Sequence, residues 1–153
     1  MNAQRVPIIL LALLSVLAAG RALNAQQTPV PRDLADEMEE ARELLDKDEP
    51  LEAAALLERY SGPDHVLRWL LSGQSYAEAG RPQKAEESFR QALELAPENN
   101  DALKGLARAH MDQQEWPDAR RRLAQALDLT TDNAEWLLAY ANVSRRLDDA
   151  RLV

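Results

Sequence analysis

An internal repeat constrains the fold of this chain more than any other feature of its sequence. The segment Gln91–Leu95 reads QALEL, and it returns as QALDL at 125–129, a shift of 34 residues. The same shift carries Ala85 to Ala119. Self-similarity at this period is typical of proteins that stack one small unit many times, so we expect an array of units rather than one compact globule.

Each unit is expected to be a pair of antiparallel helices. The chain after Pro31 is rich in Ala, Leu, Glu and Arg, and its apolar residues recur three and four positions apart without the two-residue alternation of a strand. Prolines fall near the first turn of each expected second helix, and small residues fall midway along each expected first helix. The prolines are Pro50, Pro82 and Pro117, and the small residues are Ala41, Gly73, Ala107 and Ala141.

Residues that favour helix ends lie between these helical segments. Asp64, Asn100 and Asn133 precede the first helices, and their short polar side chains predict N-caps there. Gly80 follows a first helix, and glycine readily takes the left-handed conformation that ends a helix.

One unit, Val66–Asn99, carries nine residues in the spacing W-x3-G-x2-Y-x3-G-x4-A-x3-F-x2-A-L-x3-P. These residues are Trp69, Gly73, Tyr76, Gly80, Ala85, Phe89, Ala92, Leu93 and Pro97. The pattern closely resembles the tetratricopeptide repeat family. The resemblance implies an all-α, right-handed superhelical solenoid of antiparallel helix hairpins. Its repeats would span about 33–62, 66–99 and 100–133, followed by a partial repeat at 134–153 within a repeat domain over 33–153.

Some positions depart from the family pattern. Ser72 stands where the family usually has leucine, and the next copy has His110 in place of the tyrosine. That copy also has Gln114 at the turn glycine and Thr131 at the proline. We expect His110 to be a packing residue of the core or groove wall rather than a catalytic base.

The N-terminal 25 residues have the pattern of a secretory signal peptide. A positive start containing Arg5 precedes the apolar stretch Val6–Ala19, and small residues follow it. Cleavage after Ala22 and cleavage after Ala25 both fit, and an uncleaved membrane anchor over residues 6–20 is the alternative. Residues 26–32 contain two prolines and predict an extended linker. The chain is therefore expected to be exported to the periplasm or secreted, touching a membrane only through an uncleaved N-terminus.

The family resemblance also implies where a ligand would bind. In this family the first helices line a concave groove that typically receives peptides, and some members grip a C-terminal carboxylate with a Lys/Asn set. Lys104 matches one such position, but Arg108 stands where asparagine is expected, so that clamp is not supported. The groove residues implied by spacing are Leu70, Gln74, Lys104, Arg108, Met111, Asn142 and Arg145.

Four basic residues on later first helices predict a cationic patch in an acidic protein. Lys104, Arg108, Arg145 and Arg146 would suit a carboxylate or an acidic segment. The alternative is an ordinary solvated helix face with pairs such as Arg108 and Asp112.

Composition excludes most familiar chemistry. A net charge of −8 argues against nucleic acid as a partner, because phosphate binding needs a basic surface. The chain has no cysteine and two histidines, and it has no phosphate-binding glycine motif, so we expect no metal and no cofactor. These exclusions predict a non-catalytic scaffold for a protein or peptide partner.

The last helix supports a second interpretation. Leu137 and Leu138 lie among several apolar residues after Ala134, where the end of a solenoid should be polar. The chain would then be a structural subunit of an envelope assembly or would self-associate through this helix. A related alternative is that it is a piece of a longer repeat protein.

Overall fold

Helices alone make up the regular structure of the described residues. The computed structural model describes residues 29–129 and 134–149. The helices there are α2 (Arg32–Asp46), α3 (Pro50–Arg59), α4 (Val66–Glu78), α5 (Pro82–Leu95), α6 (Asn100–Asp112), α7 (Trp116–Leu129) and α8 (Ala134–Asp149). None of them is both long enough and apolar enough to span a lipid bilayer. The predicted signal peptide, residues 26–28 of the linker, Thr131, Asn133 and residues 150–153 lie outside the described part.

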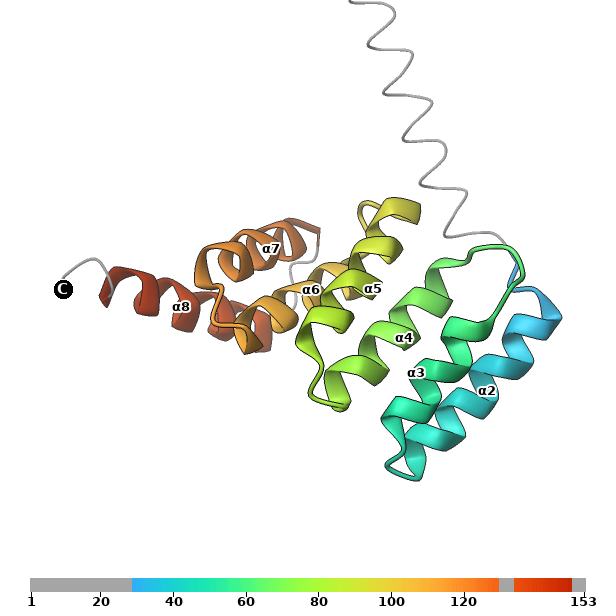
Figure 1. Cartoon of the computed structure of the whole chain (residues 1–153). Coiled ribbons are helices and arrows are strands. Elements are labelled where there is room, and N and C mark those ends of the chain that lie inside the picture. Colours follow the sequence, from blue (N-terminus) through green and yellow to red (C-terminus); the bar gives the residue numbers. More distant parts are fainter. Residues whose placement is uncertain (1–28, 130–133, 150–153) are drawn as a thin grey trace, which may run out of the picture.

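The helices pack in the order in which they follow one another along the chain. Three hairpins, α2–α3, α4–α5 and α6–α7, stand side by side, and α8 packs on α7 (Figure 1). Each hairpin also touches the next through its first helix, because α4 contacts both α2 and α6. The all-α stack of hairpins predicted from the repeat is confirmed.

All three hairpins turn in the same way. Asp48, Gly80 and Gln114 each follow the first helix and have φ values of 62°, 67° and 62°. In each turn two backbone N–H groups donate back to carbonyls of the last helical turn, which is the Schellman arrangement. These bonds run from Asp48 to Leu45, Glu49 to Leu44, Gly80 to Ala77, Arg81 to Tyr76, Gln114 to Met111 and Glu115 to His110, at 2.8–3.1 Å.

The sequence identified one of these turns. The left-handed conformation predicted for Gly80 is confirmed, whereas Asp48 and Gln114 adopt it although they carry a Cβ. Pro50 and Pro82 are the first residues of their helices, as predicted, where their missing N–H leaves no bond unmade.

The N-cap prediction was wrong for α4. The cap is His65, whose extended backbone allows its Nδ1 to accept from the backbone N–H of Leu67 at 3.2 Å. Asp64 instead accepts from the Arg68 guanidinium at 3.0 Å and from the Trp69 indole at 3.2 Å. Arg68 is buried and its Nε donates to the carbonyl of Leu57, so its charge requires a nearby carboxylate.

The N-cap prediction for α6 was wrong by one residue. Asn99 is the cap, and its side chain accepts from the N–H of Ala102 at 2.9 Å. Asn100 is the first residue of the helix. Both residues are asparagines, whose side chain suits a cap. Asn99 is the cap because its backbone is non-helical, with a ψ of 111°.

Small residues on the first helices admit large side chains from their neighbours. The ring of Phe89, on α5, lies so close to α4 and α6 that a Cβ on Gly73 would approach it to 2.7 Å and one on Gly105 to 2.4 Å. Ala41 and Ala107, which occupy the corresponding positions of α2 and α6, are fully buried. Ala141, the corresponding small residue of α8, is exposed, because no described helix covers that side of α8.

We predict that Gly105→Ala destabilises the fold through Phe89. Overpacking costs about 1–3 kcal/mol, and the higher helix propensity of alanine returns roughly 1 kcal/mol, so the free energy of unfolding should fall by up to about 2 kcal/mol. In a Phe89→Leu background the same substitution should cost less, because the new methyl group meets a shorter side chain. Urea unfolding of the wild type, the two single variants and the double variant measures the coupling between residues 105 and 89. An equal cost of Gly105→Ala in both backgrounds would contradict the predicted contact.

Candidate functional site

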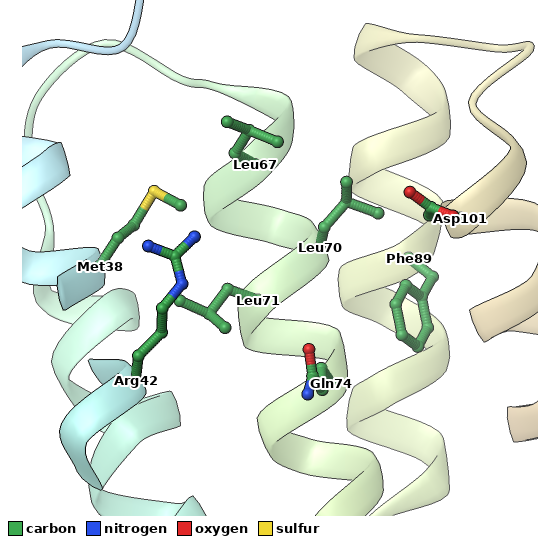
Figure 2. A pocket seen from close by; sticks show the side chains of 8 residues that line it. All are labelled: Met38, Arg42, Leu67, Leu70, Leu71, Gln74, Phe89 and Asp101. Atoms are coloured by element: carbon green, nitrogen blue, oxygen red, sulfur yellow. The ribbon is translucent and has the colours of Figure 1, made fainter. Parts of the chain in front are cut away.

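A pocket of about 330 Å³ lies between α2, α4 and the start of α6. Figure 2 shows Met38 and Arg42 on α2 opposite the leucines of α4, with Phe89 and Asp101 on the far side of α4. Its lining is Met38, Arg42, Leu67, Leu70, Leu71, Gln74, Phe89 and Asp101. The pocket is therefore mainly apolar, with one cation and one anion at its margins.

A second pocket of about 390 Å³ lies between α4, α6 and α8. Its lining is Gln74, Ala77, Glu78, Phe89, Asp101, Lys104, Gly105, Arg108 and Trp136. Gln74, Phe89 and Asp101 line both pockets, so the two adjoin and form one groove. The groove follows the face formed by the first helices α2, α4, α6 and α8.

Four of the predicted groove residues lie in this groove. Leu70 belongs to the apolar pocket, Gln74 to both pockets, and Lys104 and Arg108 to the second pocket. Gln74 donates to the carboxylate of Glu78 at 2.9 Å, which holds two polar side chains along the groove wall. The part that these four residues play in binding stays a prediction.

The other three predicted residues lie elsewhere. Met111 packs against the core cluster between α6, α7 and α8, because the last turn of α6 faces that cluster. Asn142 and Arg145 are exposed on α8 and line neither pocket. The 34-residue shift places them on the correct helix, but it does not fix how α8 is rotated.

The predicted patch of four cations forms in part. Lys104 lies over the ring of Trp136, with Nζ 5.7 Å from the centroid. Arg108 is exposed and makes no ion pair with any described residue, so the pair with Asp112 that the alternative interpretation implied does not form. Arg146 stacks over Trp116 at 4.8 Å instead of facing the groove.

Sequence reasoning missed several residues that shape the groove. Met38 and Arg42 come from the least regular repeat, where the alignment of units is weakest. Trp136, on α8, lines the second pocket beside Lys104 and is not among the predicted groove residues. Phe89 is a position of the repeat pattern that was not predicted to line the groove, yet it lines both pockets.

The groove offers contacts suited to binding. Its apolar stretch can cover hydrophobic side chains, and its charged and amide groups can pair with polar ones. Lys104 and Arg108 have no carboxylate partner among the described residues, so a negatively charged group of a ligand can approach them without displacing an existing pair.

Comparison with known structures gives the same fold at low sequence identity. The Sgt2 TPR domain from Aspergillus fumigatus is 16% identical, with 82% of this chain and 85% of that chain covered and a TM-score of 0.73. The first TPR of Spaghetti (RPAP3), bound to the HSP90 peptide SRMEEVD, is 16% identical, with 74% of this chain and 92% of that chain covered and a TM-score of 0.71. The second TPR domain of human RPAP3, in complex with the HSP70 peptide SGPTIEEVD, is 15% identical, with 71% of this chain and 92% of that chain covered and a TM-score of 0.66.

Comparison of the sequence with protein families and with curated proteins completes the assignment. A search of curated proteins found no match. Two family models, both described as tetratricopeptide repeat, match residues 38–100 and 76–143. These matches overlap and together span residues 38–143, so the chain belongs to the tetratricopeptide repeat family.

Proposed function

We propose that this protein is an exported, non-catalytic scaffold that binds an acidic peptide or protein segment in the groove. One observation carries the proposal: Lys104 and Arg108 line the second pocket with Trp136 and pair with no carboxylate in residues 29–129 and 134–149, in a protein whose net charge is −8. Glu78 and Asp101 line the same pocket, so the two cations favour a ligand that places its negative charge directly beside them.

Two structural neighbours support the choice of ligand. The peptides bound in the RPAP3 structures, SRMEEVD and SGPTIEEVD, are both acidic near their C-termini. Arg108 supplies a fork of donors that pairs well with a carboxylate, and an apolar residue of the same segment would lie over Leu67, Leu70 and Leu71.

Charge reversal in the groove tests the ligand assignment. We predict that Lys104→Glu with Arg108→Glu abolishes capture of the partner from envelope extracts and weakens binding of the isolated acidic segment at least tenfold. Lys47→Glu with Arg121→Glu changes the net charge equally, at exposed positions outside the groove, and should leave binding intact. Equal binding by both double variants, measured by fluorescence anisotropy, would overturn the groove assignment.

The proposed export rests on residues 1–25, which resemble a signal peptide. We predict that the full chain, expressed in a bacterium, reaches the periplasm or medium and begins at Leu23 or Gln26. N-terminal sequencing of the fractionated protein measures this. A protein that keeps Met1 and pellets with membranes would indicate the anchor instead, and one found unprocessed in the cytoplasm would contradict export.

Exposed leucines on α8 favour a second candidate, a structural subunit that associates with other copies. Leu137 is 53% exposed and Leu138 is 63% exposed, which is unusual for adjacent large apolar residues. This candidate predicts a dimer or larger species in sedimentation velocity that dissociates in the Leu137→Glu, Leu138→Glu variant. A monomer at high concentration would exclude it.

A further inference from the structure

Three side chains that commonly bind metals meet where α5, α6 and the α6–α7 turn come together. Glu86 comes from α5, His110 from the last turn of α6, and Glu115 from the turn itself. One ligand atom from each lies within 4.8 Å of the others, and Nδ1 of His110 is 2.7 Å from Oε2 of Glu115.

The preceding repeat links its helices without a histidine or a second glutamate at the equivalent positions. A shift of 34 residues relates His110 to Tyr76 and Glu115 to Arg81. At the junction of α3, α4 and α5, the hydroxyl of Tyr76 donates to Glu58 and accepts from Lys84 at 3.1 Å, so a neutral phenol is enough to link neighbouring hairpins. Burial, aided by the bond to Glu58, raises the pKa of Tyr76 and keeps it a neutral donor.

Surrounding contacts hold the three groups in place. The N–H of Glu115 donates to the carbonyl of His110 at 2.8 Å, which fixes the turn relative to the imidazole. Gln113 donates to one oxygen of Glu86 at 2.6 Å, and Arg90 donates to the other. Hydrogen bonds of this kind orient the ligands in known metal sites and support their affinity.

Burial and charge also suit a metal ion. The side chains of His110 and Glu86 are 5% and 11% exposed, whereas that of Glu115 is 46% exposed, so water has access from one side. The two carboxylates would balance a divalent charge. Arg90 next to Glu86 opposes a cation, and we therefore expect weaker binding than at a site of the same ligands without this guanidinium.

We propose that Glu86, His110 and Glu115 bind one Zn²⁺ ion, with water at the open position. Zinc accepts imidazole nitrogen and carboxylate oxygen at about 2.0–2.2 Å in tetrahedral geometry. Insertion of the ion at Nδ1 of His110 displaces the proton between Nδ1 and Glu115, and the neutral imidazole then carries its proton on Nε2. Nδ1 and Oε2 of Glu115 move apart by a further ~0.6 Å, a small movement for a partly exposed glutamate. The ion would tie the α6–α7 turn to α5.

Isothermal titration of the metal-free full chain with Zn²⁺, and absorption spectroscopy with Co²⁺, test the site. We expect one ion per chain, a rise in melting temperature, and visible Co²⁺ bands. His110→Tyr, which restores the residue type of the preceding repeat, and Glu115→Gln should each weaken binding at least tenfold.

His65→Asn is the matched control, because it removes the other histidine and keeps a side chain that can cap α4. This variant should bind Zn²⁺ as the wild type does. Absence of saturable binding in the wild type, or equal binding by His110→Tyr, would overturn the proposal. Either result leaves the groove assignment intact, because Glu86, His110 and Glu115 do not line the groove.

Discussion

Contact of the Phe89 ring with two glycines sets how α4 and α6 lie relative to each other. The ring leaves no room for a Cβ at Gly73 or at Gly105, so one side chain from a second helix seats both neighbouring first helices. The same ring lines both pockets. The spacing of the first helices, and with it the width of the groove, therefore depends on the packing of one aromatic residue against two small ones.

The proposed function follows from what this spacing leaves at the surface. Lys104 lies beside Gly105 in the sequence, and Trp136 reaches the same pocket from α8. Lysine over an aromatic ring keeps its charge available while its stem is covered. In a protein with a large excess of carboxylates, these cations are the part of the groove most able to distinguish acidic ligands from neutral ones.

The 34-residue period predicted the hairpins, and the family resemblance implied four residues that lie in the groove, because the hairpins and their faces depend on local pattern and on repetition. The predictions were wrong where contact with a neighbouring side chain or helix decides the role or the direction of a residue. Asp64 could not cap α4, because buried Arg68 requires its carboxylate. Met111 and Arg146 turn toward the α7 side of the array, which depends on how α8 packs. The meeting of Glu86 with His110 has no signature in the sequence, since it joins two helices through tertiary contact.

Site-specific photo-crosslinking tests the central claim, that the first-helix face holds the partner. A photoreactive amino acid would replace Gln74 in the groove or Gln83, an exposed glutamine of α5 outside it, in otherwise identical proteins. The account predicts that the acidic segment crosslinks from position 74 and not from position 83. A crosslink from position 83 with none from position 74 would contradict it.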